Sequence, residues 1–280
     1  MILWLFGIVI FSYIIFCGIL YYQQENVIFH PDKLPKNYKF QFLQPFKERF
    51  IHTKDSIDIH GILFMADSSR GLIFYLHGNA GSAASWGNIA KIYTDLNYDI
   101  FILDYRGYGK SEGNIHSEAQ FHRDIQLAYD SLKNNYPENQ IVIIGYSIGT
   151  GPAARLAAKN NPHRLILQAP YYSLIDMLHY RYTYVPSVLL RYTFKTYKFI
   201  KKTEIPITIF HGNNDNVIYY ESSLKLQKFL KSSDTFITLE DQDHHGMNYN
   251  KRYQRELKKL LQESNNKSSS IYSHTPLLPQ

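Results

Sequence analysis

The chain has 280 residues, of which 45% are hydrophobic and 19% are charged, and its formal net charge is +6. This length suits one α/β domain or at most two small ones, and the composition excludes a chain that is disordered throughout. The basic residues form no block, which argues against nucleic acid as a partner, and the single Cys17 excludes a disulfide framework and a cysteine-rich metal site.

Residues 1–22 contain no charged side chain, and a helix of that length crosses about 30 Å of hydrocarbon. The segment lacks the basic start and the small-x-small cleavage site of a signal peptide. A long uncharged run at a terminus favours a single-pass membrane anchor over a buried core helix. Only Lys33 and Lys36 lie close behind it, so the sequence leaves open which side of the membrane the rest of the chain occupies.

A polar, proline-punctuated connector at 23–47 leads into a series of short apolar runs over 48–262. The first two runs, RFIHTKD and IDIHGILFMA, alternate like antiparallel strands joined at Asp55-Ser56. The later runs are more continuously apolar and fit parallel strands that are covered on both faces; they are GLIFYLHG, YDIFILDYRG, NQIVIIGYSIG, HRLILQAP, IPITIFHG and TFITLE. Helix-length patterns lie between or after them, at 83–96, 117–134, 152–160, 221–231 and 248–262. This alternation predicts a doubly wound α/β sheet.

Two stretches depart from this alternation. Residues 170–205 are rich in tyrosine with basic residues mixed in, and they are too long for a simple crossover. A lid over the site often lies in an insertion beside the carboxyl ends of strands. A pair of packing helices without a gating role would have the same sequence pattern. Residues 263–280 are polar and end in proline-rich sequence, so we expect a disordered tail.

The pentapeptide GYSIG at 145–149 places Ser147 directly after an apolar strand. A phosphate-binding loop is one interpretation, because residues 149–154 match a dinucleotide pattern, but that pattern belongs to the first strand–helix turn of its unit. The GYGKS at 107–111 is no nucleotide loop either, since Asp104 stands where the first glycine is required. A strand, a tight turn and a helix would instead present Ser147 as a nucleophile.

A serine hydroxyl needs a base to take its proton and an acid to orient that base. Asp215 follows the strand run IPITIFHG, and His244 and His245 follow the run TFITLE. All of these residues therefore fall at the carboxyl ends of predicted parallel strands, in the order Ser, Asp, His that this architecture uses. The sequence predicts a Ser-Asp-His triad, and either histidine is a candidate for the base.

The motifs YLHGNAGS, DYRGYGKSEG, GYSIGTGPA, FHGNNDNV and DHH, in this order, resemble the α/β-hydrolase superfamily. They are most similar to its membrane-anchored branch, the alpha/beta hydrolase domain-containing proteins, and the resemblance covers about 48–262. It implies an α/β-hydrolase fold with a mostly parallel eight-stranded sheet and helices on both faces. The motifs are specific for the superfamily and say little about the substrate.

The resemblance also implies roles for further residues. The loop after the third strand would supply one backbone amide to an oxyanion hole, which assigns that hole to the amides of Asn79 and Ile148. Relatives carry a glycine before the catalytic histidine and Asn-Asp after it, whereas this chain has Asp243 before and His245-Gly246 after. The resemblance favours His244 as the base, with His245 as the alternative.

These observations predict a membrane-anchored serine hydrolase that cleaves acyl ester or thioester bonds of a small-molecule or lipid substrate through an acyl-enzyme intermediate. Such chemistry needs no metal and no organic cofactor. Two alternatives stay open: a serine peptidase of the aminopeptidase type, and a catalytically silent binding module tethered to the membrane. The sequence gives no indication of the oligomeric state.

Overall fold

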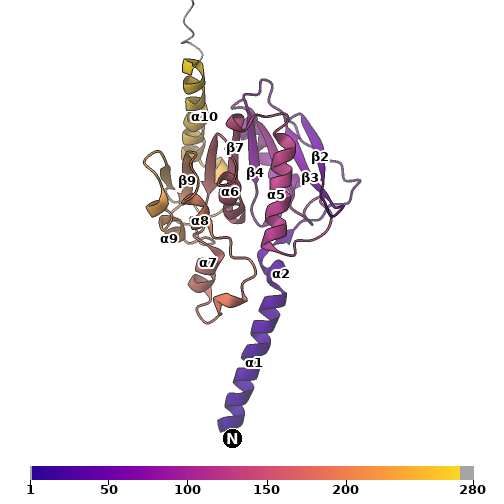
Figure 1. The fold of residues 1–280 in the computed structure, drawn as a ribbon, viewed down its shortest axis with the longest axis vertical. Helices are drawn as coiled ribbons and strands as arrows, with labels where there is room; N and C mark the ends of the chain where they lie inside the picture. Colours follow the sequence, from indigo (N-terminus) through magenta and orange to yellow (C-terminus); the bar gives the residue numbers. More distant parts are fainter. Residues whose placement is uncertain (1, 272–280) are drawn as a thin grey trace, which may run out of the picture.

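The structure, a computed structural model, describes residues 2–271, and for residues 263–271 it describes the backbone only. An eight-stranded sheet in the order β10-β9-β8-β7-β4-β6-β3-β2 forms its centre (Figure 1). Strand β3 runs antiparallel to both β2 and β6, and the other neighbours are parallel, which confirms the predicted mostly parallel sheet. The strands are β1 (His30–Pro31), β2 (Phe46–His52), β3 (Asp58–Phe64), β4 (Leu72–Leu76), β5 (Ala80–Gly81), β6 (Asp99–Leu103), β7 (Ile141–Tyr146), β8 (Arg164–Gln168), β9 (Ile207–Gly212) and β10 (Thr235–Leu239).

Helices cover both faces of the sheet, as the continuous apolar runs predict. Successive side chains of a strand point to opposite faces, so Phe74 of β4 packs into one apolar cluster and Tyr75 into another. The first cluster includes residues of α5, α6 and α8, and the second includes residues of α3, α4 and α10. The helices are α1 (Ile2–Tyr22), α2 (Gln24–Ile28), α3 (Ala83–Trp86), α4 (Ala90–Thr94), α5 (Glu118–Leu132), α6 (Thr150–Ala157), α7 (Leu174–Arg181), α8 (Thr196–Ile200), α9 (Tyr220–Leu224) and α10 (Lys251–Ile271).

Some helix bounds differ from the predicted ones. The pattern at 83–96 forms α3 and α4 with a 3₁₀ turn between them, and the ring of Phe42 would have to move to make room for a Cβ atom on Gly87 in that turn. Helix α10 continues to Ile271 and takes in half of the predicted tail, because the sequence from Lys251 to that point contains no glycine or proline to end it. The rest of the tail, 272–280, lies outside the described residues.

The predicted connector at 23–47 packs against the sheet domain. Helix α2 follows α1 directly, and Gln24, Phe29 and Phe40 are buried. Strand β1 then pairs in parallel with β5, with the His30 amide donating to the Asn79 carbonyl at 2.8 Å. The composition predicted a connector between the N-terminal helix and the domain, and it gave no indication of these tertiary contacts.

Helix α1 projects away from the domain (Figure 1). Among the described residues it alone is long and apolar enough to cross a membrane, with a mean hydropathy of 2.5 and none of that window buried. An N-terminal signal sequence can also be this long and this apolar, so the length and hydropathy of the helix support the predicted anchor without distinguishing it from a signal.

The 170–205 insertion divides into two parts. Helix α8 packs on α6, and its Ile200 is buried in the core. Helix α7 and the 3₁₀ turn at Ser187–Leu189 lie outside the sheet layers, next to α1 and α2 (Figure 1). The Glu118 carboxylate fixes the boundary between the parts, because it accepts hydrogen bonds from the backbone amides of Thr193 at 2.6 Å and Phe194 at 3.2 Å.

Glu118→Gln is expected to remove stability at neutral pH but not at strongly acidic pH. Burial acts to raise the pKa of Glu118, but hydrogen bonds from His122 and from the Thr193 and Phe194 amides outweigh burial and lower it to about 2. A carboxylate with a lowered pKa contributes stability above its unfolded pKa of about 4.3, and that contribution is lost as the pH falls towards the folded value. We expect urea unfolding in detergent to show a loss of about 1–2 kcal/mol at pH 7 that disappears near pH 2.

The matched control is Glu221→Gln, because Glu221 is an exposed glutamate in the first turn of α9. This variant should stay within about 0.5 kcal/mol of the parent at every pH. If Glu118→Gln lowered the free energy of unfolding by the same amount at every pH, the ionised carboxylate of Glu118 would not be the source of the stability.

Candidate active site

Ser147 occupies a sharp turn at the carboxyl end of β7. Its φ of 53° lies in the left-handed region, which is unfavourable for a residue with a side chain. The turn is tight because a Cβ atom on Gly145 would lie 2.6 Å from the Cβ of Ala153, and one on Gly149 would overlap the Leu76 carbonyl oxygen. Both glycines of the pentapeptide are therefore required by packing, and the hydroxyl of Ser147 is raised above the edge of the sheet.

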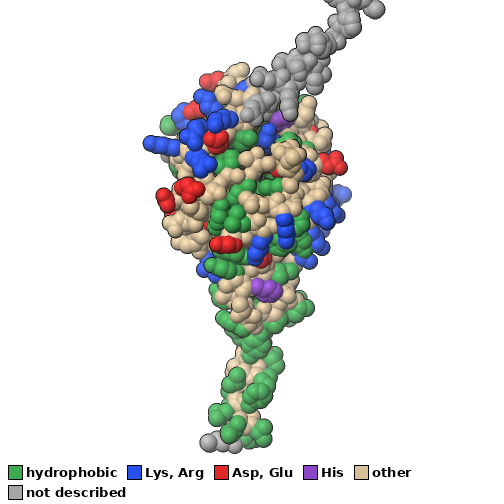
Figure 2. Space-filling view, turned by 90° about the vertical axis from the view of Figure 1, so that its left-hand side faces the viewer, with side chains coloured by type: hydrophobic (Ala, Val, Ile, Leu, Met, Phe, Trp, Pro, Cys, Tyr) green, Lys and Arg blue, Asp and Glu red, His purple; other side chains and the backbone are tan. Residues whose placement is uncertain are grey.

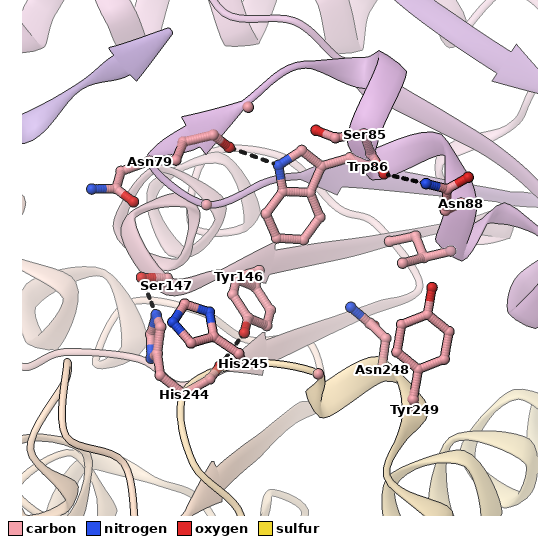
Figure 3. A pocket seen from close by; sticks show the side chains of 15 residues that line it. Asn79, Ser85, Trp86, Asn88, Tyr146, Ser147, His244, His245, Asn248 and Tyr249 are labelled. Atoms are coloured by element: carbon pink, nitrogen blue, oxygen red, sulfur yellow. Dashed lines mark hydrogen bonds between the residues drawn. The ribbon is translucent and has the colours of Figure 1, made fainter. Parts of the chain in front are cut away.

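Three of the predicted residues form one hydrogen-bonded series. His244 Nε2 lies 3.0 Å from Ser147 Oγ, and His244 Nδ1 lies 2.7 Å from Asp215 Oδ2. Ser147 and His244 lie next to each other at one end of a pocket (Figure 3). All three side chains are buried, which limits competition from water for these hydrogen bonds.

Both carboxylate oxygens of Asp215 accept hydrogen bonds, which favours its ionised form. Oδ1 accepts from the Val217 and Ile218 amides at 2.8 and 2.9 Å, and Oδ2 also lies 3.1 Å from Nε2 of His211. Burial acts to raise the pKa of Asp215, but the hydrogen bonds from His211 and His244 outweigh it and hold that pKa well below its usual range. An ionised Asp215 accepts the Nδ1 proton of His244, and this leaves Nε2 free to accept a proton from Ser147.

The two adjacent histidines have different environments. His244 is 5% exposed and its backbone carbonyl accepts a hydrogen bond from the Tyr146 hydroxyl, whereas His245 is exposed. The imidazole centroids are 5.4 Å apart, at nearly a right angle. Gly246, with a φ of 69°, turns the chain directly afterwards. The structure thus brings His244 to Ser147 and Asp215, and it leaves His245 at the rim of the pocket.

The two predicted oxyanion residues flank Ser147. Asn79 lines the same pocket, and its carbonyl is fixed by the His30 amide and by the Tyr108 hydroxyl at 2.7 Å. Ile148 follows Ser147 in the turn, and its carbonyl accepts from the Tyr171 hydroxyl at 3.0 Å. Their roles as amide donors remain predictions, but both peptide segments are held by bonds on their carbonyl side.

The pocket has a volume of about 440 Å³, which is within the range of small-molecule sites. Trp86 and Tyr249 are aromatic residues of its wall, and Ser147 and His244 lie at one end (Figure 3). The indole nitrogen of Trp86 is already used, since it donates to the Ala80 carbonyl at 2.9 Å. No aspartate or glutamate is among the described residues that line the pocket.

Sequence reasoning missed several supporting residues. His211, at the end of β9, lies four residues before Asp215 and bonds to it. This His-x-x-x-Asp spacing could have indicated a contact between the two side chains. The side chain of Asn248, which lines the pocket, bonds to Gln168 at 2.9 Å and to Tyr75 at 3.2 Å. No sequence signal marks this network, because its members come from distant segments and their spacing resembles that of core residues.

Other polar residues near the site have structural contacts. His77 is fully buried and its Nδ1 bonds to the Gly78 carbonyl at 2.7 Å, and Asp104 bonds to His60 Nδ1 at 2.8 Å. Arg106 forms ion pairs with Asp124 and Asp55. Within residues 2–262, His, Cys, Asp and Glu side chains form no group of three or more that is arranged to hold a metal ion.

Comparisons with known proteins identify relatives and similar folds. Residues 67–199 match the family described as serine aminopeptidase, S33. The chain is 31% identical over 205 residues to L404 of Acanthamoeba polyphaga mimivirus, named as an alpha/beta hydrolase, and covers 75% of it. It is 30% identical to human alpha/beta hydrolase domain-containing protein 17C, with 72% of this chain and 61% of that protein covered. The esterase Pf2001 of Pyrococcus furiosus has a similar fold, with a TM-score of 0.66 at 18% identity over 86% of this chain and 97% of its own.

Gly149→Ala is expected to destabilise the turn that carries Ser147. The added methyl group would meet the backbone carbonyl of Leu76, which cannot move without displacing β4, so we expect a loss of about 3 kcal/mol or more in urea unfolding. Gly246→Ala is the control, since a Cβ there meets no atom within 4 Å and only its φ of 69° is unfavourable. That variant should lose about 1 kcal/mol. Equal losses for the two would show that overlap does not limit position 149.

Proposed function

The chain belongs to the α/β-hydrolase family, and we propose on this basis that it is a membrane-anchored serine hydrolase that cleaves acyl ester or thioester bonds. The observation that supports this most directly is the hydrogen-bonded series from Ser147 through His244 to Asp215. A silent binding module would have no need of a strained serine with a histidine at 3.0 Å from its hydroxyl.

In the proposed mechanism Ser147 Oγ attacks the acyl carbon while its proton passes to Nε2 of His244. Asp215 stabilises the imidazolium ion that forms, and the amides of Asn79 and Ile148 donate to the developing oxyanion. The leaving alcohol or thiol takes the proton from Nε2, which leaves the acyl group on Ser147. Water then attacks with His244 again as the base, and this step releases the acid and restores the serine.

The family description leaves peptide bonds as a second candidate substrate, and the composition of the pocket argues against it. An aminopeptidase has to bind a protonated α-amino group, and such a cation requires a carboxylate partner in a buried site. The described lining of the pocket contains neither aspartate nor glutamate and includes apolar or aromatic Ile89, Trp86 and Tyr249. We therefore propose uncharged acyl groups as the part of the substrate that this pocket accepts.

A membrane location for the reaction is supported by helix α1 and by the way the chain continues from it. Only seven residues separate α1 from strand β1, which pairs with the loop that carries Asn79. If α1 crosses the bilayer, the reacting end of the domain is held close to the membrane surface. Lipid-like acyl esters or thioesters at that surface are the substrate class that this arrangement favours.

A fluorophosphonate probe is expected to label the full chain in detergent, and Ser147→Ala should abolish the labelling, because the probe reacts with an activated serine hydroxyl. Ser85→Ala is the matched control, because Ser85 lines the same pocket but its hydroxyl donates to the Ser82 carbonyl. Gel fluorescence of the labelled bands measures the result. Equal labelling of the parent and Ser147→Ala would rule out the mechanism.

The histidine variants and a substrate panel test the base and the bond type. His244→Ala should lose about 10³-fold or more in kcat, as removal of a triad member does, whereas His245→Ala should keep at least about a tenth of the parent kcat.

Turnover of p-nitrophenyl acyl esters of increasing length is compared with turnover of amino-acid p-nitroanilides. Faster anilide cleavage would favour the peptidase, and the reverse histidine pattern would move the role of base to His245.

A further inference from the structure

An apolar groove of about 500 Å³ lies between the N-terminal helices and the outer part of the insertion. Phe16 and Leu20 of α1 and Ile28 of α2 contribute to one side, and Met177 and Leu178 of α7 contribute to the other. None of the residues that line this groove lines the pocket of Ser147. The groove is therefore separate from the proposed active site.

Gln24 and Arg181, which line the groove, are already bonded to the protein. The side chain of Gln24 donates to the Leu189 carbonyl at 2.7 Å and accepts from the Arg191 amide at 2.8 Å. The guanidinium of Arg181 donates to the carbonyls of Asn216 and Val217, at 2.6 and 3.1 Å. A mostly apolar concavity in which the amide and the guanidinium are engaged elsewhere offers water few partners and is better filled by hydrocarbon.

The position of the groove indicates where that hydrocarbon comes from. Phe16 and Leu20 belong to the last two turns of the helix that is long enough to cross a membrane. Exposed apolar side chains continue from this helix onto the neighbouring end of the domain (Figure 2); they include Tyr180, Tyr182, Tyr184 and Val188, which are 58%, 51%, 60% and 85% exposed. The hydroxyl of Tyr13 also donates to the Tyr184 carbonyl, at 2.6 Å, and so joins the two surfaces.

We propose that this groove binds an acyl chain of a bilayer lipid and that the chain packs between α1 and α7. The proposal rests on the membrane anchor of the proposed function but not on its chemistry. An aliphatic chain matches the apolar walls, and the volume falls in the range of ordinary ligand sites. A bilayer supplies such chains at the level of Phe16 and Leu20, because these residues end the apolar stretch of α1.

The test replaces the methionines by photo-methionine and reconstitutes the full chain into vesicles of pure phosphatidylcholine. After irradiation, mass spectrometry identifies what each methionine has captured. We expect phosphatidylcholine on Met177, and none on Met65 or on the fully buried Met247, which lie away from the groove. Leu20→Trp should abolish the lipid adduct on Met177, since the larger indole fills the groove from α1, whereas Ile19→Trp should keep it because Ile19 is 57% exposed and does not line the groove.

The other products each contradict the proposal. Capture of a second copy of the chain would show a dimer contact in the groove, capture of α1 or α2 peptides alone would show a closed groove, and capture of water would show a wet one. A lipid adduct that survives Leu20→Trp would place the lipid outside the groove. Ser147→Ala should give the same lipid adduct as the parent, so the result stands apart from any failure of the hydrolase mechanism. Resistance of every variant to alkaline carbonate extraction checks that each is inserted in the vesicles.

Discussion

The close approach of the turn at Ser147 to strand β4 is the contact on which the rest of the site depends. Gly149 lies directly against the carbonyl oxygen of Leu76, and Gly145 lies against Ala153. This packing holds Ser147 at a φ that an unsupported serine would leave. It also brings the end of β7 next to the end of β4, so the serine and the loop of Asn79 lie at one place on the sheet edge.

The parallel sheet then determines which other residues reach that place. The order β4, β7, β8, β9 and β10 is continuous across the sheet, so Asp215 after β9 and His244 after β10 end on the same edge as Ser147. Asp215 has little freedom, because two amides and two imidazoles hold its carboxylate. The hydroxyl of Tyr146, the residue next to Ser147, in turn holds the backbone of His244. Ser147 and His244 are therefore connected through the neighbouring Tyr146 as well as through their own side chains.

The sequence predicted the sheet, and it predicted Ser147 as the nucleophile and Asp215 as the acid of the triad. Both predictions were possible because most of the apolar runs end in glycine, which marks where a parallel strand stops. The preference between His244 and His245 could not be derived from spacing, since adjacent residues share the same place in the chain and differ only in the direction of their side chains. The Asn248 network was not predictable for a similar reason: Tyr75 and Gln168 read as core positions of strands, and only folding brings their polar groups to Asn248. The packing of 23–47 was missed because proline-rich composition says nothing about long-range pairing such as that of His30 with Asn79.

The short link between α1 and β1 determines which bonds could reach Ser147 if α1 spans a membrane as proposed. Seven residues separate the two elements, five of them in helix α2, and Gln24 is bonded to the insertion. A domain on a flexible tether would lie at many heights above a bilayer, whereas these contacts tie the end of α1 to the domain. If α1 is inserted in a membrane as proposed, the same contacts would set the distance from the membrane plane to Ser147. The serine would then react with bonds held at that depth in preference to chemically identical bonds held higher or lower in the interface.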